Sequence, residues 1–218
     1  MSLFDWTIVM PVKVLGQAKS RLAVLAGPRR PELALALASD TVSAVLACPE
    51  VARLLVVTSD TLAASALSEL GACVVPDVPD SGLNEALAYG AEQAARRWPG
   101  GGTAALTADL PALRSAELGV ALAAAAGNAA AFVPDAAGVG TTLYAVRPGG
   151  RFTPRFGGES RVRHASSGAR ELSLDGVPGL RRDVDTPADL RSAVELGAGA
   201  RTTALLAKYG LLGRSVCG

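Results

Sequence analysis

Short runs of branched apolar residues alternate with alanine- and leucine-rich amphipathic stretches along most of this 218-residue chain. The alternation predicts a mostly parallel β-sheet covered by helices, because parallel strands need long crossover connections. Continuous apolar strands such as residues 54–57 indicate burial on both faces of the sheet. We predict strands over residues 6–12, 54–58, 72–75, 104–107, 130–133 and 141–146, and helices over 31–46, 61–70, 83–97, 115–126, 187–196 and 202–209.

The last third of the chain departs from this alternation. Residues 135–140 form a glycine-containing connection between two expected strands, and it is too short for a parallel crossover. The strand at 141–146 is therefore predicted to be antiparallel, and residues 151–163 are expected to be irregular. Because no repeat or linker divides the chain, we predict one α/β domain over residues 1–218. Its doubly wound sheet is mixed, mostly parallel and Rossmann-like, with helices on both faces.

Charge and hydropathy argue against nucleic acid and membrane partners. Lys and Arg number 21 and Asp and Glu 20, so the net charge of +1 supplies no general attraction to an anionic surface. The first six residues lack the pattern of an export signal, and the longest uncharged run, 118–134, is interrupted by glycine, asparagine and proline. A cytoplasmic location is expected.

The three cysteines do not form a recognisable framework. They are odd in number and widely spaced, with no C-x-x-C pair, at Cys48, Cys73 and Cys217. This pattern predicts buried or free thiols rather than disulfides or a cysteine zinc site.

The loop after the first strand is the first candidate site, because ligands of open α/β sheets bind beyond the carboxyl ends of strands. Residues 11–22 carry the cations Lys13, Lys19 and Arg21 around Gly16, a composition that suits a polyphosphate. The loop is not a Walker A motif, since alanine precedes Lys19, and no G-x-G-x-x-G follows the strand. A solvated basic turn is the alternative.

Carboxylates occur in two other segments of interest. Asp109 comes just after strand 104–107, and Asp183 and Asp185 stand one residue apart before a helix, where an extended backbone would place both on one face. If they converge near a phosphate loop, they could bind a divalent metal such as magnesium. The alternatives are that Asp109 caps a turn and that Asp185 and Asp189 belong to an ordinary helix start.

The segment from residue 151 to 164 is the third candidate. Its four arginines surround a glycine pair, a composition that suits a small acidic phosphorylated substrate, although a mobile surface loop is the alternative. His164 is the only histidine, so a Ser-His-Asp triad would require it, and no G-x-S-x-G motif supplies a nucleophile. A hydrolase of that type is therefore disfavoured.

Taken in order, these segments resemble one known family, the phosphoenolpyruvate or 2-phospho-L-lactate guanylyltransferases of deazaflavin coenzyme F-420 biosynthesis. The resemblance covers nearly the whole chain. It rests on Val12-Lys13, Ala18-Lys19-Ser20-Arg21-Leu22, Ser81-Gly82-Leu83-Asn84-Glu85, Ala108-Asp109-Leu110-Pro111, Gly138-Val139-Gly140-Thr141-Thr142, Arg155-Phe156-Gly157-Gly158-Glu159-Ser160, His164 and Arg181-Arg182-Asp183-Val184-Asp185-Thr186-Pro187. The loop at residues 14–17 is poorer in glycine than its counterpart in the wider superfamily.

The resemblance implies a nucleotide-diphospho-sugar transferase-like fold and transfer of GMP from GTP to phosphoenolpyruvate, with 2-phospho-L-lactate as the alternative acceptor and pyrophosphate as the leaving group. It also implies the site residues. Catalysis is assigned to Lys13, Lys19 and Asp109; nucleotide binding to Lys13, Lys19, Arg21, Ser81, Gly82 and Asn84; phosphoenolpyruvate binding to Thr141, Gly157 and Ser160; and magnesium (Mg²⁺) binding to Asp109, Asp183 and Asp185.

Two other hypotheses remain at this point. The same fold could transfer another nucleotide to another acceptor, such as a sugar phosphate or molybdopterin. A non-catalytic nucleotide-binding module would keep the phosphate loop but would not need the three aspartates. A downstream transferase of the coenzyme pathway that accepts the unstable product is a further possible partner.

Overall fold

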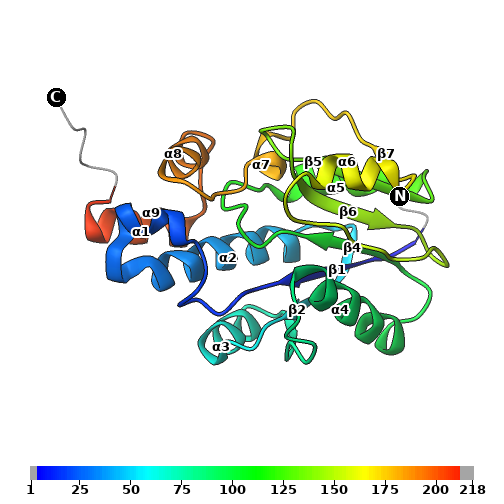
Figure 1. Cartoon of the computed structure of the whole chain (residues 1–218), viewed down its shortest axis with the longest axis horizontal. Helices are drawn as coiled ribbons and strands as arrows, with labels where there is room; N and C mark the ends of the chain where they lie inside the picture. The colour runs from blue at the N-terminus through cyan, green and yellow to red at the C-terminus, as the bar shows by residue number, and fades with distance from the viewer. Residues whose placement is uncertain (1–3, 212–218) are drawn as a thin grey trace.

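The computed structural model describes residues 4–211, and within them seven strands form one sheet (Figure 1). The strands are β1 (Trp6–Pro11), β2 (Val51–Val57), β3 (Cys73–Val75), β4 (Gly102–Leu106), β5 (Ala130–Pro134), β6 (Thr141–Val146) and β7 (Arg170–Glu171). Their order is β3-β2-β1-β4-β6-β5-β7. All paired strands are parallel except β6, which is antiparallel to both β4 and β5. The predicted mixed, mostly parallel sheet is confirmed.

The position of β6 matters for the site. It lies between β4 and β5, with Leu143 opposite Leu106, and the pairing continues where the Thr107 N–H donates to the Thr142 carbonyl at 3.0 Å. Because β6 runs against β4, its first residue, Thr141, lies at the carboxyl end of β4. An antiparallel strand thus begins at the edge of the sheet where the parallel strands end.

The helices connect and cover the strands. They are α1 (Ala23–Ala26), α2 (Arg30–Leu46), α3 (Thr61–Glu69), α4 (Leu83–Arg97), α5 (Ser115–Ala126), α6 (Ser160–Ser166), α7 (Pro178–Arg181), α8 (Pro187–Glu195) and α9 (Ala200–Tyr209), with short 3₁₀ turns at Ser20–Leu22 and Gly27–Arg29. The long predicted helices agree within about two residues at each end, as expected for amphipathic segments of this length. The short elements α1, α6, α7 and β7 were missed, because one or two turns show no measurable periodicity. The expectation that residues 151–163 are irregular was wrong from Ser160, where α6 begins.

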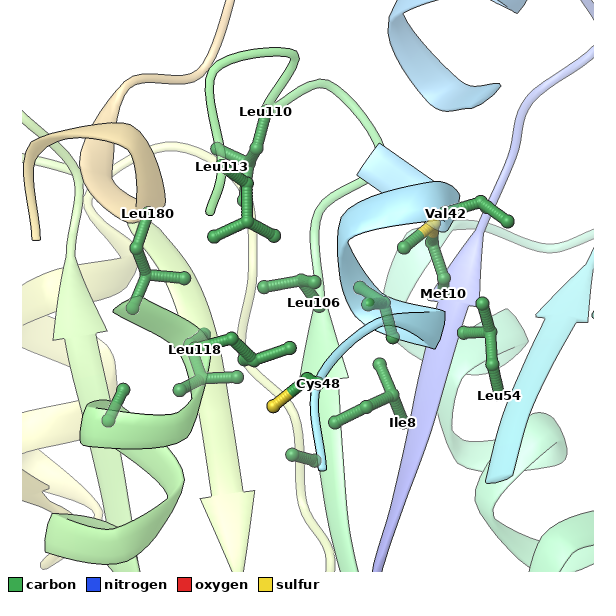
Figure 2. Close-up of a cluster of buried hydrophobic side chains, with 14 of the residues drawn as sticks. Ile8, Met10, Val42, Cys48, Leu54, Leu106, Leu110, Leu113, Leu118 and Leu180 are labelled. Carbon is green, nitrogen blue, oxygen red and sulfur yellow. The ribbon is translucent and has the colours of Figure 1, made fainter. Parts of the chain in front are cut away.

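The core has apolar layers on both faces of the sheet. On one face Ile8 and Met10 of β1 pack in a cluster with Val42 of α2 and Leu118 of α5 (Figure 2). On the other face Val9 packs in a cluster with α4 and with aromatic residues of β5 and β6. Alternate residues of β1 therefore serve opposite layers, which confirms the doubly wound architecture.

A third apolar cluster is separate from the two layers that cover the sheet. It joins the turn Ser20–Leu22, α2, α8 and α9 through Leu22, Leu33, Leu37, Leu190 and Leu206. Figure 1 shows α8 and α9, in orange and red, at the same end of the molecule as α1. Helix α9 thus packs on α2, and α8 joins the same apolar cluster.

The prediction of buried or free thiols is confirmed for Cys48 and Cys73. Cys48 is buried, Cys73 is partly exposed, and both are free thiols, while Cys217 lies outside the described residues. Across residues 4–211 we find no helix with the length and apolar character needed to cross a bilayer.

Candidate active site

A cavity of about 320 Å³ opens at the carboxyl ends of β1 and β4. Its lining includes Lys13 and Lys19 from the first loop, Thr107 and Asp109 after β4, and Asp185 from the segment before α8. These groups come from three distant parts of the sequence. The structure therefore brings together four of the residues that the sequence singled out, where ligands bind in open α/β sheets.

A main-chain hydrogen bond joins the two acidic segments. The Val184 N–H donates to the Asp109 carbonyl at 3.1 Å, and the Val184 side chain is fully buried. The flanking residues Asp183 and Asp185 are thereby held beside Asp109. Burial, and then the charges of Asp109 and Asp185, raise the pKa of Asp183 to about 7. The repulsion among the three carboxylates of this cluster favours a cation beside them.

Lys19 supplies one positive charge to this cluster. Its ammonium donates to Asp109 and, at 2.8 Å, to Oδ1 of Asp185. Burial lowers the pKa of Lys19, but the two carboxylates outweigh burial and hold this pKa above its usual value. Lys19 is 14% exposed, so the interpretation of this loop as a solvated basic turn does not hold for it. Lys13 and Arg21 of the same loop are exposed.

The three aspartates do not form a preformed metal site. Among residues 4–211, no three acidic, histidine or cysteine side chains are arranged closely enough to hold one ion. The Lys19 ammonium instead contacts Asp109 and Asp185. Nevertheless, Oδ1 of Asp109 is buried and has no hydrogen-bond partner among the described residues. Magnesium needs only one or two protein carboxylates and completes its shell with water and phosphate oxygens, so this donor set fits it.

Two residues that the sequence did not single out hold the first loop. The Arg30 guanidinium, at the start of α2, donates to the Ala18 carbonyl and, at 2.6 Å, to the Gly16 carbonyl. The Leu15 N–H donates to Oδ2 of Asp60 at 2.9 Å, while Oδ1 of the same carboxylate caps α3. Both contacts join residues at least twelve positions apart. No local pattern in the sequence could indicate them.

The segment before α8 carries both the acidic pair and the predicted helix start, and the structure confirms the helix start. Asp183 and Asp185 face the acidic cluster, and Thr186 and Asp189 form a capping box, in which Thr186 Oγ1 accepts from the Asp189 N–H at 3.3 Å. The Thr186 N–H in turn donates to Asp189 at 2.8 Å. The cap begins the helix directly after Asp185, so the local helix signal also fixes where the acidic pair lies.

The predicted nucleotide-binding segment lies at the start of α4 but does not line the cavity, apart from Leu83. Ser81 and Gly82 are exposed, and Gly82 has φ +130°, a conformation that favours glycine. The side chain of Asn84 is occupied. Its Oδ1 accepts from the Phe156 N–H at 2.7 Å, and its Nδ2 donates to the Phe156 carbonyl at 3.1 Å. Asn84 thus connects the predicted nucleotide segment to the loop before α6.

The predicted acceptor residues lie outside this cavity, next to β6 and α6. Thr141 and Ser160 are buried, whereas Gly157 is exposed and has φ +89°. The turn before Thr141 is held by Asp135, whose carboxylate accepts from the N–H groups of Val139 and Gly140 at 2.9 and 2.8 Å. Thr141 is held in turn by His164, whose Nδ1 lies 3.0 Å from the Thr141 hydroxyl oxygen.

His164 is not arranged as part of a catalytic triad. Its ring is fully buried and stacks on Tyr144 with centroids 4.6 Å apart. Its second nitrogen, Nε2, accepts a hydrogen bond from the Arg155 N–H. Burial, and then the positive charges of Arg163 and Arg155, lower the pKa of His164 to about 4. None of its hydrogen bonds among the described residues goes to a carboxylate. The ring is therefore neutral near pH 7.

Comparison with known proteins gives concordant results. A family model described as guanylyl transferase CofC like matches residues 6–214. A phosphoenolpyruvate guanylyltransferase of Thermomonospora curvata is 63% identical over 203 residues, which cover 93% of this chain and 89% of that protein.

Two solved structures share the fold at low identity. A protein of Desulfovibrio desulfuricans assigned to the nucleotide-diphospho-sugar transferases has a TM-score of 0.67 at 18% identity, covering 96% of this chain and 97% of its own. A Mycobacterium tuberculosis protein crystallised with manganese has a TM-score of 0.50 at 22% identity, covering 88% and 98%. These likenesses agree with the predicted nucleotide-diphospho-sugar transferase-like fold.

Proposed function

This chain belongs to the CofC-like guanylyl transferase family, and we propose that it transfers GMP from GTP to the phosphate group of phosphoenolpyruvate. Membership of the family makes it a nucleotidyltransferase. The observation that carries the proposal is the meeting of Lys13, Lys19, Asp109 and Asp185 around one cavity, with Thr141 beginning β6 at the same edge of the sheet. Cations suited to a triphosphate and carboxylates suited to a metal thus meet at one cavity, at the edge of the sheet where Thr141 lies.

GTP would lie with its triphosphate over the first loop. Lys13 and Lys19 line the cavity, and Arg21 is exposed two residues further on, so the loop offers three cations to the phosphates. Ser81, Gly82 and Asn84 at the start of α4 would flank the guanosine. Arg30 holds the loop through two of its carbonyls, and this keeps the cations in place before the nucleotide binds.

Phosphoenolpyruvate would bind between β6 and the loop before α6. The Thr141 hydroxyl offers a hydrogen bond, and the lack of a side chain at Gly157 leaves its N–H open to an anionic oxygen. Ser160 follows at the first turn of α6. The hydroxyl and N–H donors of these residues suit the phosphate and carboxylate oxygens of phosphoenolpyruvate.

Asp109, Asp183 and Asp185 would hold the magnesium ion. When bound, the ion neutralises phosphate oxygens and orients them for substitution at phosphorus. The protein's own contribution is the buried Oδ1 of Asp109 and the negative cluster around it.

The reaction requires no general base from the protein. A phosphate monoester is largely ionised at neutral pH, so an acceptor phosphate oxygen can attack the α-phosphorus of GTP directly while pyrophosphate leaves. Negative charge accumulates on the leaving oxygens, and Lys13 and Lys19 are placed to neutralise it. To reach the nucleotide, Lys19 gives up its contacts with Asp109 and Asp185. The neutral, enclosed His164 agrees with this base-free chemistry.

The test is pyrophosphate release with magnesium, using GTP, ATP, CTP or UTP against phosphoenolpyruvate, 2-phospho-L-lactate and 3-phosphoglycerate. We expect the fastest release with GTP and phosphoenolpyruvate. Faster release with 2-phospho-L-lactate would assign that compound as the acceptor instead. Release with none of the twelve pairs, from a protein that still binds GTP, would contradict the proposal and favour a binding module.

A further inference from the structure

We propose that His164 is a positioning residue for the acceptor, acting through Thr141: its neutral ring donates to the Thr141 hydroxyl oxygen, so that the hydroxyl hydrogen is free to be donated to the acceptor's anionic group. The inference rests on the proposed function, in which Thr141 contacts the acceptor. It adds a role for a residue that touches neither substrate.

The protonated nitrogen follows from the hydrogen-bond partners of the ring. A backbone N–H can only donate, and the Arg155 N–H points to Nε2 of His164 at 3.0 Å. Nε2 must therefore be the nitrogen without hydrogen. In a neutral imidazole the hydrogen is then on Nδ1, which lies 3.0 Å from the Thr141 oxygen. A nitrogen that carries hydrogen cannot accept from the Thr141 hydroxyl, so the second hydrogen bond runs from His164 to Thr141. The Ser160 main chain also accepts from the ring and raises the pKa of His164, which agrees with a hydrogen on the nitrogen that does not face Arg155.

This direction decides what Thr141 offers to a ligand. A hydroxyl has one hydrogen to donate and two lone pairs that accept. If Thr141 donated to His164, only lone pairs would face the ligand, and an anionic oxygen would be repelled. Because His164 occupies one of these lone pairs, the hydrogen is left for the acceptor. The site needs this donor, since a phosphate or carboxylate presents only acceptors.

The surroundings keep the ring neutral and in one orientation. Tyr144 stacks on it, the edge of Phe156 meets it with centroids 5.2 Å apart, and Phe132 lies 5.6 Å away. The charged groups that act on it are Arg163 of its own helix and Arg155 of the preceding loop, and both are cationic. Burial and these cations lower the pKa of His164, so the ring does not protonate near pH 7.

The same ring also connects β6 to the loop before α6. Thr141 belongs to β6, whereas Arg155 belongs to the loop that carries Gly157, and His164 hydrogen-bonds to both. On the other side of this loop, Asn84 holds Phe156. Rotation of the ring would therefore disturb both the Thr141 hydroxyl and the loop.

The first test does not depend on any substrate. His164 is the only histidine of the chain, so ¹⁵N-labelled protein without an affinity tag gives one pair of ring nitrogen resonances. We expect the neutral form with hydrogen on Nδ1 from about pH 5 to about pH 8. Hydrogen on Nε2, or a doubly protonated ring at neutral pH, would overturn the inference whatever the enzyme's substrate.

The second test separates the two hydrogen bonds by substitution. His164→Asn keeps an amide donor near the Nδ1 position, and His164→Gln keeps an amide acceptor near the Nε2 position. We expect His164→Gln to raise the KM for phosphoenolpyruvate about tenfold with the KM for GTP unchanged, and His164→Asn to change the acceptor KM much less. Equal effects of the two variants on both substrates would contradict a role through Thr141.

A double-mutant cycle identifies Thr141 as the intermediary. Thr141→Val removes the hydroxyl at constant shape, and we expect it to raise the acceptor KM at least as much as His164→Gln does. Adding His164→Gln to Thr141→Val should then have no further effect, whereas additive effects would overturn the inference. If Thr141→Val leaves the acceptor KM unchanged, Thr141 does not bind the acceptor. The proposed role of His164 is then also wrong, whichever ring nitrogen carries the hydrogen.

Discussion

At the scale of single residues, Lys19 reaches the site with its backbone in an unfavourable conformation. Lys19 has φ +55°, in the left-handed region that non-glycine residues rarely adopt. This conformation costs about 1–2 kcal/mol for an L-residue. The ion pairs to Asp109 and Asp185 offset this cost and direct the ammonium into the cavity. A lysine placed in this way is positioned by the tertiary structure and not by the helix that follows it.

Asp109→Asn tests the acidic cluster. The substitution keeps the shape of the side chain but removes a charge from the proposed metal site. We expect turnover to fall by at least about a hundredfold, with an unchanged circular dichroism spectrum. Asp5→Asn, at an exposed carboxylate before β1, is the matched control and should retain full activity. Near-normal pyrophosphate release by the Asp109 variant would remove this residue from the metal site.

The buried His164 predicts a pH dependence of stability. Its pKa is lowered from the ordinary 6.5 to about 4, so between these values the unfolded chain binds a proton that the folded protein does not. Its contribution to stability is complete above about pH 6.5 and decreases as the pH falls towards 4. The advantage of the wild type over His164→Asn in the free energy of unfolding should therefore shrink by about 2 kcal/mol between about pH 7 and about pH 5. Urea unfolding at both values measures it, and a constant advantage would show that the ring is not neutral.

At the scale of elements, one glycine sets how closely α4 approaches the sheet. A methyl carbon at Gly90 would lie 2.5 Å from Cγ1 of Val9 and 2.7 Å from Cγ2 of Val57. No neighbouring side chain could avoid such contacts without moving the helix away from β1 and β2. Because Asn84 is in the same helix, a shift of α4 would also move the contact with Phe156.

Gly90→Ala is therefore expected to destabilise the protein although alanine favours helix by about 1 kcal/mol over glycine. We expect a net loss of about 1–3 kcal/mol in the free energy of unfolding from overpacking. Gly119→Ala, in the middle of α5, is the matched control, because the added methyl would meet only the flexible carboxylate of Glu50. Thermal denaturation of both variants should lower the Tm for Gly90→Ala alone. An unchanged Tm would mean that α4 can move at little cost.

At the scale of the whole molecule, a buried carboxylate in α2 caps the last helix. Oδ1 and Oδ2 of Asp40 accept from the N–H groups of Arg201 and Thr202 at 3.1 and 2.8 Å. These groups lie in the first turn of α9, whose N-cap position is Gly199 and offers no side chain. A side chain at Gly199 would also collide with the Asp40 carboxylate. The cap of α9 thus comes from 161 positions earlier in the chain.

Asp40→Ala should release α9 from α2. Loss of the cap and of two buried hydrogen bonds to a charged group is expected to cost about 2–3 kcal/mol. Chemical denaturation measures this loss, and limited proteolysis should show faster cleavage near residues 197–199. Arg201→Ala, which keeps the backbone N–H, is the control and should cost much less. Equal effects would mean that the guanidinium of Arg201, and not the cap, holds the helix.

Features that depend on local periodicity and local turn chemistry could be predicted from the sequence. The ranges of α4, α5 and β6 agree with the prediction, and the short connection before Thr141 was enough to predict an antiparallel strand. The candidate residues around the cavity were also identifiable, because charged side chains stand out against an apolar chain. Residues 13, 19 and 109 follow apolar strands, and residue 185 belongs to an acidic pair before a helix.

The contacts that join these segments could not be predicted from the sequence and are set by the folded chain. The Asp109–Val184, Asn84–Phe156 and Asp40–Thr202 contacts link residues separated by 72 positions or more, and none has a signature in the neighbouring sequence. The insertion of β6 between β4 and β5 likewise depends on the packing of the whole sheet. Hydrogen bonds and ion pairs depend on distance in space, whereas periodicity reports only on neighbours along the chain. For this reason His164, which the sequence presented as a lone histidine, acquires its role only through the fold.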